Sequence, residues 1–294
     1  MNTFSFVIAT YNSSSYIKNA VQSIVDNKYD PNKYEIIIVD DGSVDNTLDI
    51  CYKLKAQYSN IQIFLKPNGN WGSVINYVCK NKLVKNDYVV ILDSDDLLSK
   101  KFFKNVNKLT KNSDILLTSL IVKGKKLTYY ASPYYWLFRR VVPKEKRFTV
   151  AFAPFSIVMK KEIFYQSPTL EENVSYQDFY LYVDLLKKAK TVRFTYKVGG
   201  IYNKYRPGNT MGALWSDKRM NQEKILHKKL LENNIAEPLV FRIFMNGYCK
   251  KARETNYKIQ MNNKPRPSWL PWWIHWLYWI VYIVHLKKYI SIKK

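Results

Sequence analysis

The sequence predicts an α/β fold built on a mainly parallel sheet flanked by helices. Two observations lead to this class. Short runs of apolar and β-branched residues recur through the N-terminal third of the chain, and segments with apolar residues three and four apart lie between them. Strands that alternate with helices are typical of parallel sheets with right-handed crossovers, whose functional loops gather at the carboxyl ends of the strands.

The expected elements have clear boundaries. Four N-terminal strands are rich in apolar and β-branched residues, over 4–9, 34–39, 61–65 and 88–92. Helices are expected between them, over 17–25, from 45–47 to 54, and over 73–82. A further strand near 191–196 and a helix that begins at Asp178 are expected later in the chain. The loops between these elements hold the candidate functional residues.

Polar motifs follow or connect these strands. They are Ala9-Thr10-Tyr11-Asn12; Val39-Asp40-Asp41-Gly42-Ser43 with Asp45 and Thr47; Asn68-Gly69 with Asn76; and Asp93-Ser94-Asp95-Asp96. Two oxygen donors one residue apart, such as Asp93 and Asp95, can share a divalent cation or divide it with a ribose hydroxyl. An isolated acidic motif is more often a solvated turn. Its place after an apolar strand, together with the other motifs, favours a site for metal and phosphate.

In their order and spacing, these four motifs resemble the nucleotide-binding half of family-2 glycosyltransferases, which have the GT-A fold with its Rossmann-like sheet. The resemblance is close over residues 3–115 and continues more loosely to about residue 212. It implies an inverting enzyme of the bacterial cell-surface polysaccharide type. Such an enzyme would take a hexose or amino-hexose from a UDP-sugar with the help of Mn²⁺ or Mg²⁺.

The resemblance also implies which residues bind the base of the donor. It places Ala9, Tyr11 and Asp41 around the uracil, with Asn68 closing the pocket. Asp41 is favoured over Asp40 because a carboxylate can accept the uracil imide N–H. The two side chains should point to opposite sides of the strand, so one of them can be structural.

The metal and phosphate contacts are implied in the same way. Asp95 would be a metal ligand, and Asp93 would contact the ribose or serve as a second metal ligand. Ser94 and Asn76 would complete the donor site. Relatives often have Arg before the helix Asn, whereas this chain has Ile75, so any phosphate contact from that position is lost or supplied elsewhere.

An inverting transfer also needs a general base for the acceptor hydroxyl, a step typically worth about 10²–10⁴-fold. Asp178 matches the Asp of the family's Glu-Asp motif. Gln177 stands where Glu is usual, so the charge that could raise the pKa of the base or orient it is missing. An Asp that only caps a helix and complements its dipole would give the same pattern. Asp184, Glu171 and Glu172 are the alternative bases.

Residues 198–212 resemble the family's R-x-G-S/N segment, a loop that folds over the donor diphosphate. Arg206 would offer a planar fork to phosphate, and the glycines would give the segment hinge freedom. An ordinary Pro-Gly turn with a solvated arginine is the alternative.

The region between the metal motif and Asp178 is expected to select the acceptor. Residues 123–147 combine aromatic side chains, which stack on sugars, with Lys and Arg, which attract phosphate. An anionic glycan or a lipid-linked sugar phosphate would fit this segment. The alternative interpretation is a solvated basic face over aromatic core residues.

The net charge of the chain is +24, from 47 basic and 23 acidic residues, and it favours binding to a polyanion or an anionic lipid. Nucleic acid is not expected, because no zinc-finger, RNP-like or helix-turn-helix pattern is present.

The C-terminal part is expected to attach the protein to a membrane. Residues 269–286 are rich in Trp, contain no Asp, Glu, Lys or Arg, and have basic residues on both sides. As a helix this segment would extend about 27 Å, just under a hydrocarbon core of about 30 Å. A helix that lies on the cytoplasmic face is therefore favoured over a spanning helix or a protein contact, including a homo-oligomer contact.

The predicted organisation has three parts. Residues 1–215 form the catalytic domain, with nucleotide-sugar binding in 1–115 and the acceptor side in 116–215; a helical region (216–263) and a membrane-associating segment (264–294) follow. The predicted function is transfer from a UDP-sugar to a membrane-linked or polymeric cell-surface glycan. The alternatives are a nucleotidyltransferase, which shares an acidic metal site, and a non-catalytic adaptor for membranes or polyanions.

Overall fold

The computed structural model describes residues 1–123, 128–130, 156–174 and 177–203, and the single positions 206, 222 and 225. The chain divides into two compact units, Met1–Leu214 and Trp215–Lys294. All the strands and helices reported below belong to the first unit.

The described residues of this unit form a sheet of nine strands. They are β1 (Phe4–Thr10), β2 (Tyr34–Asp40), β3 (Ile61–Leu65), β4 (Tyr88–Asp93), β5 (Leu97–Leu98), β6 (Ile115–Val122), β7 (Thr128–Tyr130), β8 (Ile157–Lys160) and β9 (Val192–Tyr202). The order is β3-β2-β1-β4-β8-β6-β9-β5, and β7 pairs with β6. The four predicted strands at the start of the chain are confirmed and lie side by side.

The expectation of a mainly parallel sheet holds for only part of it. Strands β3, β2, β1 and β4 are parallel, as are β6 and β9. Strand β8 is antiparallel to both of its neighbours, and the pairs β5–β9 and β6–β7 are also antiparallel. The sheet is therefore mixed beyond β4, because the later strands are not joined by the successive helical crossovers that parallel neighbours require.

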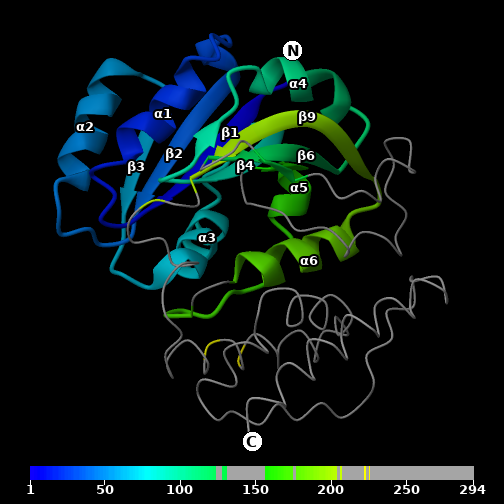
Figure 1. The fold of residues 1–294 in the computed structure, drawn as a ribbon. Coiled ribbons are helices and arrows are strands. Elements are labelled where there is room, and N and C mark those ends of the chain that lie inside the picture. Colours follow the sequence, from blue (N-terminus) through cyan, green and yellow to red (C-terminus); the bar gives the residue numbers. More distant parts are fainter. Residues whose placement is uncertain are drawn as a thin grey trace, which may run out of the picture. The chain divides into compact units, whose positions relative to one another are not determined.

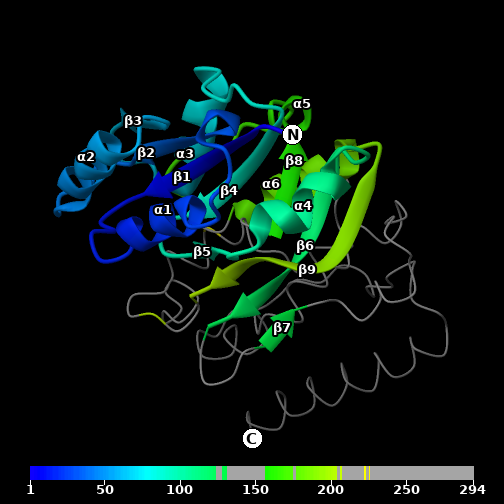
Figure 2. The ribbon, with the colours of Figure 1, turned by 90° about the horizontal axis from the view of Figure 1, so that it is seen from above.

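Helices cover both faces of the sheet (Figure 1; Figure 2). Helices α1 (Ile17–Val25), α2 (Thr47–Gln57) and α4 (Phe102–Thr110) lie on one face, and α3 (Asn70–Lys80), α5 (Lys161–Phe164) and α6 (Asp178–Lys188) lie on the other. A 3₁₀ turn, η1 (Pro31–Lys33), precedes β2. Helices α1 and α2 share a face because their right-handed crossovers run in the same direction along the sheet, whereas α3 leads back to β4.

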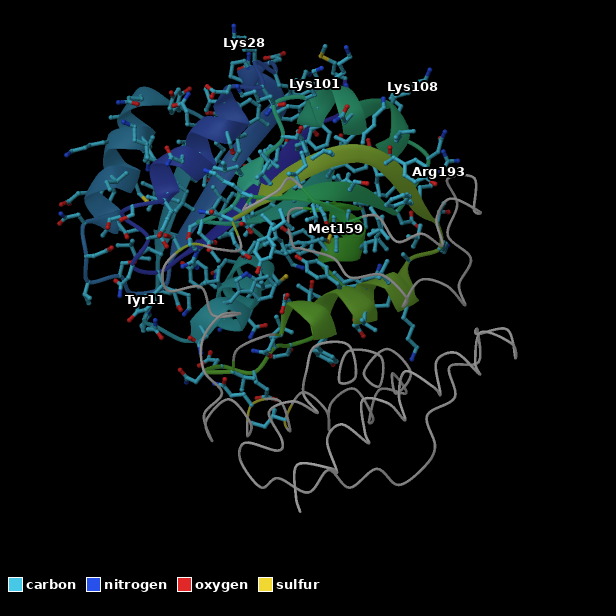
Figure 3. All side chains as sticks on the ribbon, viewed as in Figure 1. Tyr11, Lys28, Lys101, Lys108, Met159 and Arg193 are labelled. Atoms are coloured by element: carbon cyan, nitrogen blue, oxygen red, sulfur yellow. The ribbon has the colours of Figure 1, made fainter. Side chains whose placement is uncertain are left out.

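An aromatic cluster fills the core between α4 and β1. Phe102 and Phe103 of α4 make edge-to-face contacts with Phe4 and Phe6 of β1. All four rings are buried, and burying each contributes roughly 1.5–3 kcal/mol. Further along the sheet, Met159 of β8 is fully buried inside the unit (Figure 3). The core thus fixes the strands whose ends carry the polar motifs.

Strand register brings three of these motifs to one edge of the sheet. Ala9, near the end of β1, lies opposite Val39 of β2 on one side and Asp93 of β4 on the other. Tyr11 follows β1 and projects from the ribbon at this edge, with 50% of its surface exposed (Figure 3). The loops after β1, β2 and β4 therefore meet in space.

Two of the predicted boundaries that differ from the structure lie near the candidate functional residues. Helix α3 begins at Asn70 rather than at Ser73, so part of the expected loop is helical. Strand β9 continues through Gly199 to Tyr202, where a loop was expected. A Cβ at position 199 would lie 2.1 Å from the Thr118 hydroxyl, so glycine permits the close packing of β9 against β6.

Several predictions on the second half of the chain lie outside the described residues. They concern the membrane-associating segment, the preceding helical region apart from Gln222 and Ile225, and most of the basic aromatic segment 123–147. Within the described part of the chain, no helix combines the length and the apolar character needed to cross a membrane.

Candidate active site

Three carboxylates gather where β4 ends. Asp93 is the last residue of β4, and Asp95 and Asp96 lie in the turn before β5. One carboxylate oxygen of each residue lies within 4.8 Å of those of the other two. Such oxygen ligands suit Mg²⁺ or Mn²⁺, so this acidic cluster fits a divalent cation. Asp96, which the sequence motif left without a role, joins the two predicted ligands.

Burial, together with crowding of negative charge, raises the pKa values of two carboxyl groups in the acidic cluster. Burial, with the charges of Asp95 and Asp178, raises the pKa of Asp93 to about 7. Burial and the charges of Asp93 and Asp95 also raise the pKa of Asp96. The same mutual repulsion would favour a bound cation, which interacts with the ionised carboxylates.

The raised pKa values predict a strong pH dependence of metal binding. A carboxylate must lose its proton to bind a metal, so protons compete with Mn²⁺ as the pH falls through the raised pKa of Asp93. We expect the Mn²⁺ affinity measured by calorimetry to drop at least tenfold from about pH 8 to about pH 6, with measurable proton release. An affinity that stays constant over this range would contradict the assigned protonation.

The indole of Trp71 holds Asp93 in place. Its Nε1 donates a hydrogen bond to Asp93 Oδ1 at 2.9 Å. Trp71 lies in the first turn of α3, next to Gly72. A Cβ at position 72 would lie 2.5 Å from the amide nitrogen of Gln177, so glycine lets α3 approach the start of α6. The packing of α3 thus links the acidic cluster to the segment that carries Asp178.

Asp178 is the first residue of α6 and is partly exposed. Its charge acts on Asp93, as described above, and on Tyr182 one turn along the helix. Burial, followed by the charges of Asp93 and Asp178, raises the pKa of the Tyr182 hydroxyl well above its ordinary value. The structure therefore brings Asp178 within electrostatic range of Asp93, although the two residues are far apart in the sequence.

Gln177, where the family usually has Glu, anchors the loop before α6. It is 1% exposed. Its Oε1 accepts from the backbone N–H of Glu171 at 2.7 Å, and its Nε2 donates to the carbonyl of Val174 at 2.9 Å and to that of Glu171. A neutral amide can donate and accept at once, which an ionised Glu cannot do. Gln177 therefore fixes the start of α6.

The three alternative bases lie in different surroundings. Asp184 is buried and forms an ion pair of 2.6 Å with Lys188. Glu171 and Glu172 are exposed in the loop before α6. Among these acids, Asp178 is the one whose charge acts on the acidic cluster.

Asp41 lies after β2 in a buried network that joins two loops. It is 3% exposed, and its Oδ1 accepts from Lys66 Nζ at 2.5 Å and from the backbone N–H of Gly69 at 3.0 Å. Lys66 also donates to Ser73 Oγ at 2.7 Å. The amide of Asn68 donates to the carbonyl of Asp41 at 2.9 Å. These contacts hold the Asp41 carboxylate in a single orientation.

The neighbouring Asp40 has a different set of contacts. It accepts hydrogen bonds from the backbone N–H and the hydroxyl of Ser43, at 2.9 and 2.6 Å, and so closes the turn after β2. Gly42 in this turn has a φ of +75°, which favours glycine. A Cβ there would also lie 3.1 Å from the backbone nitrogen of Asn68.

The other residues predicted to bind the sugar donor differ in their burial and in their hydrogen-bond partners. Ala9 is partly buried at the end of β1. Ser94 is buried, and its hydroxyl shares a hydrogen bond of 2.7 Å with that of Ser13. The Asn76 amide donates to the carbonyl of Leu170 at 2.8 Å and accepts from its N–H at 3.0 Å. Asn76 thereby connects α3 to the loop before α6, and its contact with the donor stays a prediction.

Arg206 lies against the acidic cluster. Its Nε forms an ion pair with Asp95 Oδ2, and its guanidinium lies 5.3 Å from the centre of the Tyr16 ring. Nearby, the backbone N–H of Asn203 donates to Asp96 Oδ1 at 2.8 Å. The residue predicted to bind the donor diphosphate is therefore next to the predicted metal ligands.

Three side chains of this site were not assigned from the sequence: Lys66, Trp71 and Asp96. Asp96 directly follows the paired carboxylates and belongs to the same motif. Lys66 and Trp71 flank the Asn68-Gly69 motif, which was a local signal for both. Their partners, Asp41 and Asp93, are distant in the sequence, so only the folded chain shows these pairs.

Comparison with known proteins agrees with this geometry. The family model "Glycosyl transferase family 2" matches residues 5–166. An uncharacterized glycosyltransferase of Mycoplasma genitalium is 35% identical over 292 residues, which cover 98% of both chains.

Two solved structures share the fold. One is TarS of Staphylococcus aureus, a poly(ribitol-phosphate) beta-N-acetylglucosaminyltransferase, in complex with UDP-GlcNAc; its TM-score is 0.68 at 20% identity, over 85% of this chain and 76% of that chain. The other is the mannosyltransferase PcManGT from Pyrobaculum calidifontis in complex with GDP-Man and Mn²⁺, with a TM-score of 0.62 at 15% identity over 84% and 71%. By the family match and the Mycoplasma relative, the chain belongs to glycosyl transferase family 2 and is a glycosyltransferase with a GT-A-like fold.

Proposed function

We propose that this enzyme transfers a hexose or amino-hexose, with inversion, from a UDP-sugar to a membrane-linked or polymeric cell-surface glycan. The observation that carries the proposal is the position of Asp178, whose charge acts on Asp93 of the acidic cluster. Inverting transfer requires a base for the acceptor hydroxyl and stabilisation of the departing diphosphate. A carboxylate beside a cluster that fits a divalent cation supplies both.

The roles of the site residues follow from their positions. Asp178 would take the proton of the acceptor hydroxyl, and Arg206, which forms an ion pair with Asp95, would contact the diphosphate. Asp93, Asp95 and Asp96 would hold the cation, with Trp71 orienting Asp93. When bound, Mn²⁺ or Mg²⁺ supplies Lewis-acid stabilisation of the leaving diphosphate.

The relatives support this choice of donor and acceptor class. The TarS structure contains UDP-GlcNAc, and TarS acts on poly(ribitol-phosphate). The PcManGT structure contains GDP-Man and Mn²⁺, which makes a guanine nucleotide the rival donor. The fixed carboxylate of Asp41 can accept the imide N–H of uracil, and because the N1–H and amino group of guanine are also donors, the comparison of UDP with GDP decides between them.

Replacing Asp41 by Asn tests the donor assignment. The wild-type enzyme should bind UDP more tightly than GDP, and Asp41→Asn should lose about tenfold or more in UDP affinity, since a hydrogen bond to a charged group is worth roughly 1.5–3 kcal/mol. Calorimetry with both nucleotides measures this. Assays of turnover should detect released UDP, whereas release of pyrophosphate would indicate a nucleotidyltransferase. Equal binding of UDP and GDP would remove the uracil role of Asp41.

We also propose that residues 264–294 hold the enzyme at the cytoplasmic face of the cell membrane. The Trp-rich segment and its basic flanks support this proposal. Deletion from Trp269 onward should abolish co-sedimentation with vesicles that contain anionic lipid, while UDP binding is retained. If the shortened protein still sediments with these vesicles, the membrane contact lies elsewhere in the chain.

A further inference from the structure

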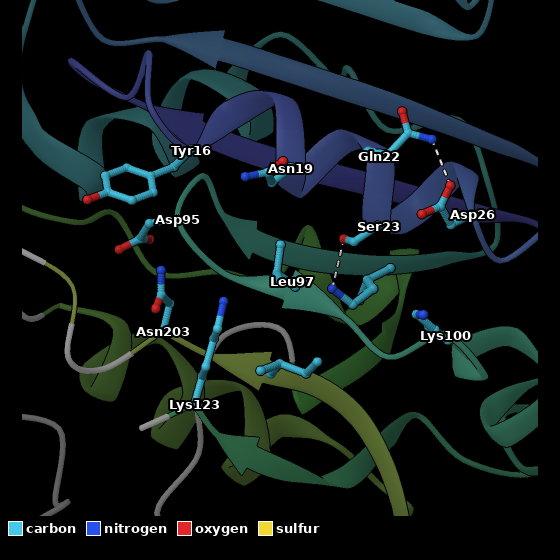
Figure 4. A pocket seen from close by; sticks show the side chains of 12 residues that line it. Tyr16, Asn19, Gln22, Ser23, Asp26, Asp95, Leu97, Lys100, Lys123 and Asn203 are labelled. Carbon is cyan, nitrogen blue, oxygen red and sulfur yellow. Dashed lines mark hydrogen bonds between the residues drawn. The ribbon is translucent and has the colours of Figure 1, made fainter. Parts of the chain in front are cut away.

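A groove of about 340 Å³ opens beside the acidic cluster, on the side of α1 (Figure 4). It runs between α1, the short strand β5 and the end of β9. Asp95 and Tyr16 lie at one end, and Asp26 and Lys100 lie at the other. None of the roles proposed above uses this groove, apart from Asp95 at its mouth.

The groove has an apolar lining and a set of polar groups without partners. Leu97, Leu98 and Ile201 provide the apolar part. The side chains of Asn19 and Lys123 have no hydrogen-bonding or ionic partner among the described residues, and both reach into the groove in Figure 4.

Other polar groups of the groove are already engaged. Gln22 donates to Asp26 at 2.7 Å, and the hydroxyl of Ser23 accepts from the backbone N–H of Leu98 at 2.9 Å. By contrast, the Asn203 side chain, which lies near Asp95 in Figure 4, forms no hydrogen bond with another described residue. Among the described residues, the amides of Asn19 and Asn203 and the ammonium groups of Lys100 and Lys123 are thus available to a ligand.

The apolar lining and the free amide and ammonium groups together indicate the chemical class of the ligand. Free amides donate and accept at once, which suits hydroxyl groups, and an apolar lining suits the C–H faces of a sugar or polyol. The free ammonium of Lys123 is a compact charge that suits phosphate. The volume is at the lower end of ligand pockets, of about 300–1,000 Å³, and so fits one or two sugar or polyol units.

We propose that the groove binds a phosphorylated sugar or polyol unit of the acceptor, with Lys123 on the phosphate and Asn19 and Asn203 on hydroxyls. This inference rests on the proposed function, since it names the acceptor chemistry of the same enzyme. The groove begins at Asp95, so a unit bound in it lies next to the transfer site. Lys123 is also the first residue of the basic aromatic segment that the sequence assigns to acceptor choice.

Binding of ribitol 5-phosphate to the full-length protein, without nucleotide, tests the proposal. Calorimetry or ligand-observed NMR should show saturable binding to the wild type, and uncharged ribitol should bind more weakly. Lys123→Glu should weaken the binding of ribitol 5-phosphate by about tenfold or more, and Asn19→Ala by a few-fold. Lys53→Glu, a charge reversal at an exposed position of α2, should bind like the wild type.

Two results would overturn the proposal: no saturable binding to the wild type, or equal affinities for wild type and Lys123→Glu. Circular dichroism checks that each variant is folded, and the milder Lys123→Gln provides a second readout if Lys123→Glu is not. Titration of UDP in the same variants separates the two proposals. Loss of ribitol 5-phosphate binding in Lys123→Glu supports the groove as the acceptor site, even if neither the wild type nor the variant binds UDP. Absence of UDP binding by the wild type would count against the donor assignment instead.

Discussion

Asp178→Asn is expected to reduce glycosyl transfer by about 10²–10⁴-fold while leaving UDP-sugar affinity nearly unchanged. The amide keeps the size of the side chain but cannot take the proton of the acceptor hydroxyl. Gln177, rather than Asp178, makes the contacts that fix the start of α6, so the variant should fold. Steady-state kinetics with calorimetric donor titration separates the loss in kcat from a loss of binding.

Glu172→Gln is the matched control for this variant. It removes one carboxylate from an exposed position in the loop just before α6, and its turnover should stay within about twofold of wild type. Asp184→Asn removes the partner of Lys188 and should lower stability more than activity. Unchanged transfer in Asp178→Asn would exclude Asp178 as the base, and a large loss in Glu172→Gln would place the base in the loop.

Asp95→Asn is expected to lower turnover by about 10²-fold or more, because the departing diphosphate loses much of its charge stabilisation. The acidic cluster would lose one of its three carboxylates and the ion-pair partner of Arg206. The affinity for Mn²⁺ should fall with the turnover. Excess Mn²⁺ should restore part of the activity if Asp93 and Asp96 still bind the ion.

Asp49→Asn controls for the change in net charge. Asp49 is exposed on α2, away from the acidic cluster, and its loss should leave both Mn²⁺ affinity and turnover unchanged. If Asp95→Asn retained wild-type Mn²⁺ affinity and turnover, Asp95 would not be a metal ligand.

The sequence predicted the donor half of the fold because its signals are local. The apolar runs that form β1, β2, β3 and β4, and the helical patterns between them, repeat the strand-helix unit of a parallel sheet. Once these strands are parallel neighbours, their carboxyl ends must meet, which brings Tyr11, Asp41 and Asp93 to one edge. Local pattern and sheet geometry were therefore sufficient.

The half of the sheet that combines parallel and antiparallel strands had no comparable signal in the sequence. Strand β8 is four residues long, and its antiparallel place between β4 and β6 depends on pairing with strands distant in the sequence. The extension of β9 through Gly199 was not expected, because residues 198–212 resemble the family's loop over the donor diphosphate, whereas here Gly199 allows contact with Thr118. Tertiary packing decided both cases.

The contacts within the site were also hidden from the sequence. Lys66 with Asp41, and Trp71 with Asp93, are pairs between loops that meet only in the folded chain. The role of Gln177 became clear through its backbone partners, because the sequence showed only that a charge was missing. The motifs indicated which residues could bind the donor or act in catalysis, and the folded chain showed which other residues hold them in place.

Calorimetric titration of UDP, GDP and CMP, with and without Mn²⁺, into the full-length wild type and Asp95→Asn tests the central claim most directly. We expect UDP to bind selectively to the wild type, to depend on Mn²⁺, and to lose that dependence in Asp95→Asn. Absence of nucleotide binding by the wild type in every condition, or binding that is indifferent to both Mn²⁺ and Asp95, would contradict a metal-assisted transfer from a UDP-sugar.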